Sequence, residues 1–332
     1  MKIAIRADGG PERGYGHLVR TGALAKECLQ RGDDVLYFTQ TPTAVREELP
    51  STVTSVRLDG QNEIEEVIQY IEDYSVDAIF TDSFKIDTIY QERLSKTRAT
   101  LAVRHNFKHY TVCCDVLIYG DLHAPYLEYD WIGTKPEFCL GPDYILLREQ
   151  FRQAAQKEKI WRDDPKRVLI VMGGSDVNNA TPRIMETFEN FDGTIDVVIG
   201  PGFENEREIK RTAQAMRSDF NLLFNPENMA EILYRADFAV SAVGGTIFEL
   251  LATQTPFIGI PQVDNQKQRA AALQRRDLGL IVSNTDALSK HVDTLHFSEL
   301  RRKLYDNIDG IVDGCGAKRV YESLRNGSNF SD

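Results

Sequence analysis

Short apolar runs alternate with longer amphipathic stretches along most of the chain. The apolar runs are rich in Val, Ile, Leu and Phe and are too short for helices, so they predict buried strands. The stretches between them repeat their apolar positions every three or four residues; in 63–75 these positions are 64, 67, 68 and 71. Strands that alternate with helices predict right-handed βαβ units and a parallel sheet.

The alternation occurs in both halves of the chain. In the first half we expect strands over 2–8, 34–40, 77–83, 99–105 and 115–121, and helices over 17–32, 63–75 and 88–96. In the second half we expect strands over 167–176, 194–202, 220–225, 237–245 and 256–262, and helices over 181–191, 206–217, 229–236, 246–254 and 265–279, with a further helical pattern at 298–308. The fold class is therefore α/β, with two doubly wound parallel sheets.

Residues 151–166 lie between the two series. They are mainly charged and polar and end in Asp-Pro, so we interpret them as a linker. A chain of 332 residues exceeds what one hydrophobic core usually serves, which also favours two domains. We expect an N-terminal domain over 1–150 and a C-terminal domain over 167–332, and a return of the last helix to the N-terminal half stays open.

The charge balance limits the partners. The net charge of −11 argues against a nucleic-acid surface but not against the binding of one nucleotide. No stretch approaches the ~20 apolar residues that span a bilayer, and the apolar part of the amino end is too short for a signal peptide. We therefore predict a cytoplasmic protein without stable membrane insertion, and the sequence does not determine its oligomeric state.

Five cysteines without a secretion signal predict free thiols. Cys113 and Cys114 are adjacent, and His105 and His109 lie nearby in the sequence, but the cysteines lack the spacing of a zinc motif. We therefore expect no metal site and no cofactor.

Open parallel sheets bind ligands beyond the carboxyl ends of their strands, so the segments that follow strands are the candidate sites. Gly173, Gly174 and Ser175 follow one expected strand, and exposed N–H groups at such a turn suit an anion. A plain strand-to-helix connection with a positive φ needs one glycine, so two glycines favour close approach of a ligand.

Gly244, Gly245 and Thr246 have the same form and open the helix that carries Glu249. One alternative is a capping box, in which Thr246 caps the helix and Glu249 bonds back to its start. The other is that the amides hold a phosphate and Glu249 accepts hydrogen bonds from ribose hydroxyls. A diphosphate needs more than one set of amides, so two such loops in one half favour the second alternative.

Asp264, Asn265 and Gln266 follow another expected strand and begin a basic helix. One alternative is that Asp264 or Asn265 is an N-cap. The other is that the three polar side chains recognise sugar hydroxyls.

His17 is expected in the first turn of a helix, directly behind a turn that contains Gly14 and Gly16. The positive end of the helix dipole disfavours the imidazolium ion and so lowers the pKa of the ring. A neutral imidazole at pH 7 can act as a general base. The alternative is a histidine at the helix start without a catalytic role.

The motif R-x-D…G-x-G-H-x-x-R at residues 6–20 resembles the opening of the nucleotide-sugar hydrolases of the pseudaminic acid pathway and of the related SpsG-type spore-coat polysaccharide proteins. M-G-G-S-D at 172–176, G-G-T…E at 244–249 and D-N-Q at 264–266 follow in the order of these families. The last two segments are also similar to the nucleotide-binding region of the peptidoglycan N-acetylglucosaminyltransferase.

The resemblance implies a glycosyltransferase-B architecture, in which two Rossmann-like halves face a cleft, and a nucleotide-sugar substrate with UDP as the expected nucleotide. It implies that His17 activates water, that Glu249 binds the ribose, and that the loops at 173–175 and 244–246 hold the diphosphate. The implied substrate-binding residues are Asp8, Gly14, Gly16, Arg20, Gly173, Gly174, Ser175, Phe224, Asn225, Gly244, Gly245, Thr246, Glu249, Asp264, Asn265 and Gln266.

The chain departs from the hydrolase pattern at two positions. Asp82-Ser83-Phe84 stands where the hydrolases have Asp-His-Tyr, and Phe248 stands where they have Asn. Two polar groups expected in the cleft are therefore apolar here. The departures leave the nucleotide half intact and bear on the sugar and the reaction.

We predict hydrolysis of a nucleotide-diphosphate sugar at its anomeric carbon, with inversion and without a metal, in surface polysaccharide or nonulosonic acid biosynthesis. Arg20 or Lys267 is expected to help the amides hold the leaving diphosphate. A glycosyltransferase that uses the same donor and an acceptor alcohol is the alternative. A non-catalytic nucleotide-sugar-binding protein is the third reading.

Overall fold

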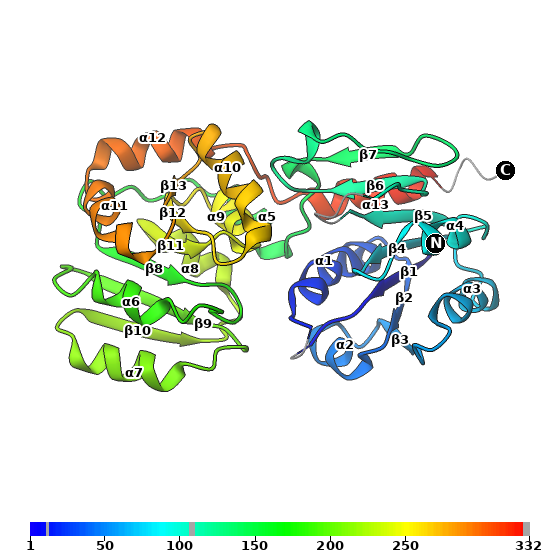
Figure 1. Cartoon of the computed structure of the whole chain (residues 1–332), viewed down its shortest axis with the longest axis horizontal. Helices are drawn as coiled ribbons and strands as arrows, with labels where there is room; N and C mark the ends of the chain where they lie inside the picture. Colours follow the sequence, from blue (N-terminus) through cyan, green and yellow to red (C-terminus); the bar gives the residue numbers. More distant parts are fainter. Residues whose placement is uncertain (11–12, 106–109, 328–332) are drawn as a thin grey trace. The chain divides into compact units, whose positions relative to one another are not determined.

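The chain divides into two compact units in a computed structural model that describes residues 1–10, 13–105 and 110–327 (Figure 1). Unit 1 comprises Met1–Arg148 and Gly314–Asp332, and unit 2 comprises Glu149–Asp313. The chain thus leaves unit 1, forms unit 2 and returns to unit 1 with its last segment.

The described part of unit 1 forms a seven-stranded parallel sheet with the order β3-β2-β1-β4-β5-β6-β7. Its strands are β1 (Lys2–Ala7), β2 (Asp34–Thr39), β3 (Thr54–Arg57), β4 (Ala78–Asp82), β5 (Thr100–Arg104), β6 (Val116–Tyr119) and β7 (Glu137–Leu140). Its α-helices are α1 (Gly16–Gln30), α2 (Pro42–Glu48), α3 (Glu63–Asp73), α4 (Thr88–Leu94) and α13 (Gly316–Gly327).

Both faces of this sheet are buried. Ile3 and Ile5 of β1 face a core with α1, α2 and α13, whereas Ala4 faces a core with α3 and α4. This alternation follows from the two-residue period of a strand. In Figure 1 the red helix α13 lies beside the strands of unit 1, and it contacts α1, β5 and β6. The last helix therefore packs on the N-terminal sheet.

The described part of unit 2 forms a six-stranded parallel sheet with the order β10-β9-β8-β11-β12-β13. Its strands are β8 (Arg167–Val171), β9 (Thr194–Ile199), β10 (Asp219–Phe224), β11 (Phe238–Ala242), β12 (Phe257–Ile260) and β13 (Leu280–Ile281). Its α-helices are α5 (Glu149–Ala155), α6 (Thr181–Glu186), α7 (Glu206–Ala215), α8 (Met229–Arg235), α9 (Thr246–Ala252), α10 (Lys267–Arg275), α11 (Leu288–Leu295) and α12 (Ser298–Ile308).

In each sheet the strand order reverses beside the first strand. β1 lies between β2 and β4, and Ala7 at its end pairs with Asp82. β8 lies between β9 and β11, and Val171 pairs with Ser241. Doubly wound sheets bind ligands at the carboxyl ends of their strands beside such a reversal. The segments after β1, β4, β8 and β11 are therefore in position to form sites.

The predicted α/β class with two parallel sheets is confirmed. The sequence did not predict α2, β3, β7, β13 or α11. β3 and β7 are four-residue strands at the two edges of the unit 1 sheet, and β3 carries a single apolar residue, Val56. α5 covers the start of the segment interpreted as a linker. This helix belongs to unit 2, and its apolar Phe151 is fully buried.

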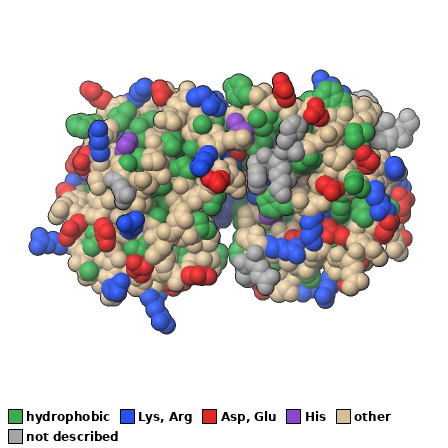
Figure 2. Space-filling model, in the orientation of Figure 1, with side chains coloured by type: hydrophobic (Ala, Val, Ile, Leu, Met, Phe, Trp, Pro, Cys, Tyr) green, Lys and Arg blue, Asp and Glu red, His purple; other side chains and the backbone are tan. Residues whose placement is uncertain are grey.

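Acidic and basic side chains are interspersed over the visible faces of both units in Figure 2. No helix in the described part of the chain combines the length and apolar character needed to cross a membrane. Over the same residues there is no cluster of His, Cys, Asp or Glu side chains that could hold a metal ion, and all five cysteines are free. His109 lies outside the described residues.

Candidate active site

The loop between β1 and α1 brings His17 to the carboxyl edge of the unit 1 sheet. Gly9 permits this approach, because a Cβ atom there would lie 2.5 Å from Cγ of the buried Leu18. Gly14 has a φ of +76°, which residues with side chains rarely adopt. α1 begins at Gly16, so His17 lies in its first turn, as the sequence predicts.

His17 contacts a buried carboxylate at the end of β4. Its Nδ1 lies 2.9 Å from Oδ1 of Asp82 and 2.7 Å from Nη2 of Arg20. Arg20 in turn donates to both oxygens of Asp82, from Nε at 2.5 Å and from Nη2 at 3.0 Å. Residues three apart lie on one face of a helix, which explains how His17 and Arg20 reach the same carboxylate.

Asp82 is almost completely buried, with 2% of its surface exposed. Burial raises the pKa of its carboxyl group, but the guanidinium groups of Arg20 and Arg104 and the contact with His17 outweigh burial and hold that pKa well below its usual range. Nη1 of Arg104 lies 3.4 Å from Oδ1 of Asp82. Asp82 is therefore a fixed negative charge at neutral pH.

Phe84 contacts the His17 ring edge-on. The two ring centroids lie 5.2 Å apart with an angle of 87° between the planes, and Phe84 remains 56% exposed. This residue is one of the two apolar departures from the hydrolase pattern. An exposed aromatic ring beside a histidine offers an apolar surface to a ligand.

Asp8 is engaged by groups of its own unit. It accepts hydrogen bonds from Nη2 of Arg6 (2.9 Å), Nη1 of Arg13 (2.7 Å), Oγ1 of Thr39 (3.0 Å) and the backbone N–H of Gln40 (2.7 Å). Nη2 of the fully buried Arg6 also lies 2.6 Å from Oε1 of Glu63. The structure thus gives Asp8 the role of an anchor for the β1–α1 loop, and its contact with substrate stays a prediction.

The loop after β8 has two glycines in different conformations. Gly173 has a φ of +77°, so the backbone itself favours glycine there. Gly174 has no positive φ, and a Cβ atom on it would meet nothing within 4 Å. The fold does not require glycine at Gly174, which fits the prediction that a ligand approaches the backbone beside the exposed Ser175.

The buried carboxylate of Asp176 fixes the end of this loop through hydrogen bonds. It is 5% exposed and accepts from the N–H groups of Ala180 at 2.9 Å and Thr181 at 3.0 Å, and from Nδ2 of Asn205 at 2.9 Å. α6 begins at Thr181, so 176–180 separate the loop from the helix. Residues 173–175 thus form a turn before the helix, as the sequence predicts, and binding of an anion by their N–H groups stays a prediction.

The loop after β11 runs directly into α9. Thr246 is the first helical residue, Gly245 occupies the N-cap position, and no side chain caps the helix. The capping role considered for Thr246 is therefore wrong. A Cβ atom on Gly245 would meet nothing within 4 Å, and one on Gly244 would meet only Nε2 of Gln266, at 3.8 Å. Glu249 lies half-buried in the first turn of α9.

The segment after β12 joins these two loops. Oε1 of Gln266 accepts from the backbone N–H of Gln262 at 2.8 Å, and Nδ2 of Asn178 donates to the carbonyl oxygen of Gln262 at 2.8 Å. Gln266 also lies beside Gly244. The structure therefore brings together the loops after β8, β11 and β12 at one edge of unit 2.

α10 begins at Lys267 with Gln266 at its N-cap position, so neither Asp264 nor Asn265 caps it. The N-cap alternative for these residues is wrong. Asp264 instead pairs with Nζ of Lys267 at 2.6 Å, with both side chains exposed.

Phe248 does not face the solvent. It is 2% exposed, and the guanidinium carbon of Arg269 lies 5.0 Å from its ring centroid. Nη1 of Arg269 donates to the carbonyl oxygen of Val243 at 2.9 Å. The expectation that Phe248 places an apolar group in the cleft is therefore wrong, because this ring lies in the core of unit 2 and supports the arginine that holds the loop after β11.

Phe224 ends β10 and Asn225 follows it, at the same edge of unit 2. Phe224 is 46% exposed, and Nζ of Lys210 lies 4.7 Å from its ring centroid. Asn225 has a φ of +41° and donates its N–H to the carbonyl oxygen of Ile199 at 2.9 Å. The end of β10 thus presents an aromatic ring to solvent. The substrate-binding role that the resemblance implies for Phe224 and Asn225 stays a prediction.

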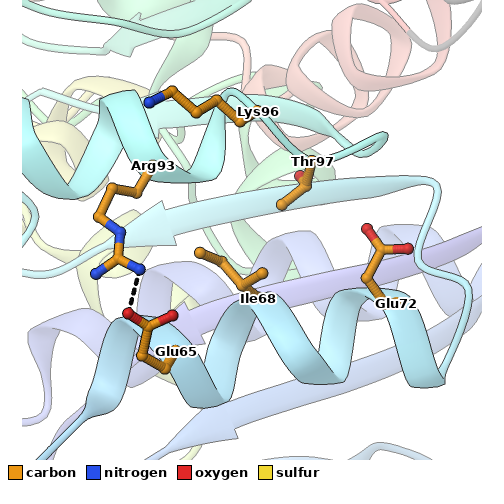
Figure 3. A pocket seen from close by; sticks show the side chains of 6 residues that line it. All are labelled: Glu65, Ile68, Glu72, Arg93, Lys96 and Thr97. Atoms are coloured by element: carbon orange, nitrogen blue, oxygen red, sulfur yellow. Dashed lines mark hydrogen bonds and ion pairs between the residues drawn. The ribbon is translucent and has the colours of Figure 1, made fainter.

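A hollow of about 410 Å³ lies between α3 and α4 (Figure 3). Its polar lining combines Glu65 and Glu72 with Arg93 and Lys96, and Arg93 is paired with Glu65. None of the predicted site residues lines it. The hollow therefore belongs to the surface of the two helices rather than to the carboxyl edge of the sheet.

The sequence prediction assigned no role in the unit 1 site to Asp82, Arg104 or Glu63, although it matched Asp82 to the hydrolase pattern. Asp82 carried one available signal, since it ends a buried strand with a carboxylate. Its pairing with Ala7 shows that this strand lies beside β1. The sequence alone does not say which strands are neighbours.

Comparisons with known proteins agree with this architecture. Residues 154–309 match the glycosyltransferase family 28 C-terminal domain. The chain is 24% identical to the spore coat polysaccharide biosynthesis protein SpsG of Bacillus subtilis, over 98% of both chains. It is also 24% identical to the UDP-2,4-diacetamido-2,4,6-trideoxy-beta-L-altropyranose hydrolase of Campylobacter jejuni, over 83% of this chain and 97% of that protein. The resemblance inferred from the motifs is confirmed.

A protein of Methanocaldococcus jannaschii, MJ1062, is 28% identical over 286 residues, which are 81% of this chain but only 57% of that protein. Among solved structures, MurG of Acinetobacter baumannii has a TM-score of 0.69 at 14% identity, over 98% of this chain and 99% of that one. This likeness shows that the two units have the fold of a glycosyltransferase of the B type.

Proposed function

We propose that this protein hydrolyses a UDP-linked sugar at the anomeric carbon, with His17 as the general base. The observation that carries the proposal is the contact of His17 with the buried Asp82, at 2.9 Å, in the first turn of α1. A histidine held by a carboxylate is the arrangement that removes a proton from a nucleophile in many hydrolases.

The relatives support this choice of substrate and reaction. The Campylobacter jejuni relative is by its name a UDP-sugar hydrolase, and the Bacillus subtilis relative is by its name a polysaccharide biosynthesis protein. The domain matched at 154–309 covers the loops proposed to bind the nucleotide. We place the reaction in the biosynthesis of a surface polysaccharide or of a nonulosonic acid.

In the proposed reaction the water oxygen forms a bond to C1 of the sugar, and the bond between C1 and the phosphate oxygen breaks. His17 takes a proton from the attacking water, the configuration at C1 inverts, and UDP leaves with the bonding electron pair. General base catalysis of this kind contributes ~10²–10⁴-fold to a rate.

Unit 2 supplies the binding of the leaving group in this proposal. The backbone at Gly174, Gly244 and Gly245 is open to a ligand, since a Cβ atom at these positions would meet little or nothing. Amides that already point to a developing negative charge stabilise it without reorganisation. Ser175 and Thr246 are proposed to add hydroxyl donors, and Glu249 to accept from the ribose.

A glycosyltransferase is the second candidate, because the matched domain at 154–309 is named for a glycosyltransferase family. In that reaction an acceptor alcohol replaces water beside His17 and the donor site is the same. The third reading, a binding protein without activity, leaves the buried contact of His17 with Asp82 and Arg20 without a purpose.

The test is the release of UDP from a panel of UDP-sugars without an acceptor, with the full chain and with His17→Gln. We expect release by the wild type, a loss of ~10²–10⁴-fold in kcat for His17→Gln, and unchanged UDP affinity by calorimetry. In water labelled with oxygen-18 the label is expected in the sugar and not in UDP. Release that needs an added alcohol supports the transferase, and UDP binding without turnover under either condition contradicts both enzymes.

A further inference from the structure

Nδ1 of His17 has two neighbours with opposite demands. The carboxylate of Asp82 can only accept a hydrogen bond, so its contact at 2.9 Å needs a proton on Nδ1. The guanidinium of Arg20 can only donate, so its contact at 2.7 Å needs a lone pair on Nδ1. One nitrogen cannot satisfy both, and the position of the proton depends on which neighbour is more costly to oppose.

An unfavourable contact of Nδ1 with Asp82 costs more free energy than one with Arg20. It is 2% exposed, and a lone pair of Nδ1 against its ionised Oδ1 would place two acceptors in contact inside the protein. Arg20 is 22% exposed, and its Nε and Nη2 already donate to Asp82. Arg20 therefore needs no bond to Nδ1, whereas that nitrogen has an anion beside it in every protonation state of the ring.

We propose that Asp82 is a positioning residue, which holds the proton of His17 on Nδ1 and so leaves Nε2 as the basic nitrogen. The position of the proton is inferred from the geometry alone. Its consequence for catalysis rests on the proposed function. In the proposed hydrolysis the proton of the attacking water goes to Nε2, and the resulting imidazolium keeps its Nδ1–H bond to Asp82. In the opposite tautomer Nε2 carries hydrogen and has no lone pair to accept that proton.

The surroundings of the pair resist a change of this arrangement. Arg20 and Arg104 bind the carboxylate of Asp82 from two directions, so it does not turn away from His17. Phe84 packs edge-on against the imidazole at 5.2 Å between centroids and opposes its rotation. The spacing G-H-x-x-R thus has a physical reason, since the arginine three residues on fixes the acceptor of the histidine proton.

The test is the nitrogen-15 spectrum of protein labelled at histidine, which distinguishes an Nδ1–H from an Nε2–H ring and needs no substrate. The His17 signals are identified by their loss in His17→Gln. We expect Nδ1–H in the wild type, in Arg20→Gln and in Arg104→Gln, and a mixture of tautomers in Asp82→Asn. An Nε2–H ring in the wild type that becomes Nδ1–H in Arg20→Gln would overturn the inference.

Asp82→Asn is also expected to lower kcat by ~10²–10⁴-fold with little change in KM. The ring then loses its fixed tautomer and also the negative charge that stabilises the imidazolium formed when Nε2 takes the proton. Its fold is checked by near-UV circular dichroism. If this variant does not fold, the spectra of the wild type and of Arg20→Gln still decide. A chain that hydrolyses no UDP-sugar but has Nδ1–H contradicts the proposed function alone, and hydrolysis with Nε2–H contradicts this inference alone.

Discussion

The carboxyl edges of the two sheets differ in the chemical groups that form them. In unit 1 the edge consists of charged side chains that bind one another: Arg6 with Asp8 and Glu63, and Arg20 with Asp82. In unit 2 the edge consists of backbone turns, several of them at glycines. Hydrogen bonds of polar side chains hold these turns in place. The same topological position thus carries fixed side chains in one unit and accessible backbone in the other.

The difference matches two chemical tasks. Proton transfer needs one side chain in a defined orientation, and a network of ion pairs supplies that orientation at the price of buried charge. Binding of a polyanion needs several N–H groups that a ligand can approach, and side chains would obstruct them. The comparison is thus consistent with the proposal that unit 1 carries the acid–base chemistry and unit 2 binds the anion. The following substitutions test the stability of the two edges and, at Gly174, the binding of UDP.

The largest effect is expected for Arg6→Leu. Arg6 is fully buried between Asp8 and Glu63, so its removal leaves two carboxylates without their shared cation. Breaking a buried ion pair on one side costs about 3–5 kcal/mol of the free energy of unfolding. Hydrogen exchange measured by mass spectrometry should show faster exchange in peptides of unit 1 and an unchanged exchange rate in peptides of unit 2.

The matched control for Arg6→Leu is Arg93→Leu. Arg93 pairs with Glu65 on the surface of the same unit, with both side chains more than a third exposed. Exposed pairs contribute about 0–1 kcal/mol, so little change is expected. Equal effects of the two substitutions would show that the charges at the edge of unit 1 are not a structural network.

Lys159 gives unit 2 a different response to pH. Burial lowers the pKa of its amine to about 7, although it donates to Oγ1 of Thr255 at 2.7 Å. The folded state therefore holds the proton less firmly than the unfolded state, and the free energy of unfolding rises with pH between about 7 and the ordinary lysine pKa.

Lys159→Met should remove this dependence and stabilise unit 2 at pH 7 by on the order of 2 kcal/mol, since no charge is then buried. The measurement is urea unfolding at several pH values from 7 to 9.5, with the difference between wild type and variant as the readout. A difference that does not shrink as the pH rises contradicts a buried, titrating amine.

The smallest effects on stability are expected for alanine substitutions of the two glycines after β8, and the two substitutions should differ. Gly173→Ala should cost about 1–2 kcal/mol, because its φ of +77° strains any residue with a Cβ atom. Gly174→Ala should change stability by less than ~0.5 kcal/mol, since its Cβ atom would meet nothing. Calorimetry with UDP should nevertheless show ~10-fold weaker binding to Gly174→Ala. Unchanged affinity would remove this loop from the proposed nucleotide site.

The pattern of the sequence was sufficient for the fold class and for most elements. Strands such as β1, β4 and β8 are buried on both faces and therefore mainly apolar, and the 3.6-residue period of α3 survives because one face packs on the sheet. The edge strand β3 escaped prediction because it carries one apolar residue. The edge strand β7 escaped because its apolar run of three residues is shorter than the runs that indicate a strand.

Chain order and composition also placed His17 at a helix start and the glycine turns after strands, since both are local properties. Glycine at Gly14 and Gly173 is required by a positive φ, which is a local property as well. What local reasoning could not supply was the difference between these glycines and Gly174 or Gly245, where only the surrounding space shows that a side chain would fit.

The partners of His17 were decided by tertiary structure. Asp82 lies 65 positions further along the chain but beside β1 in the sheet, because the strand order reverses there. The same holds for Phe248, which looked like a lost polar group in the sequence and lies in the core of unit 2. By itself the sequence determined the elements and the residue types at their ends. Only the packing of the strands decided which charges meet, because electrostatic contacts depend on distance in space and not on distance along the chain.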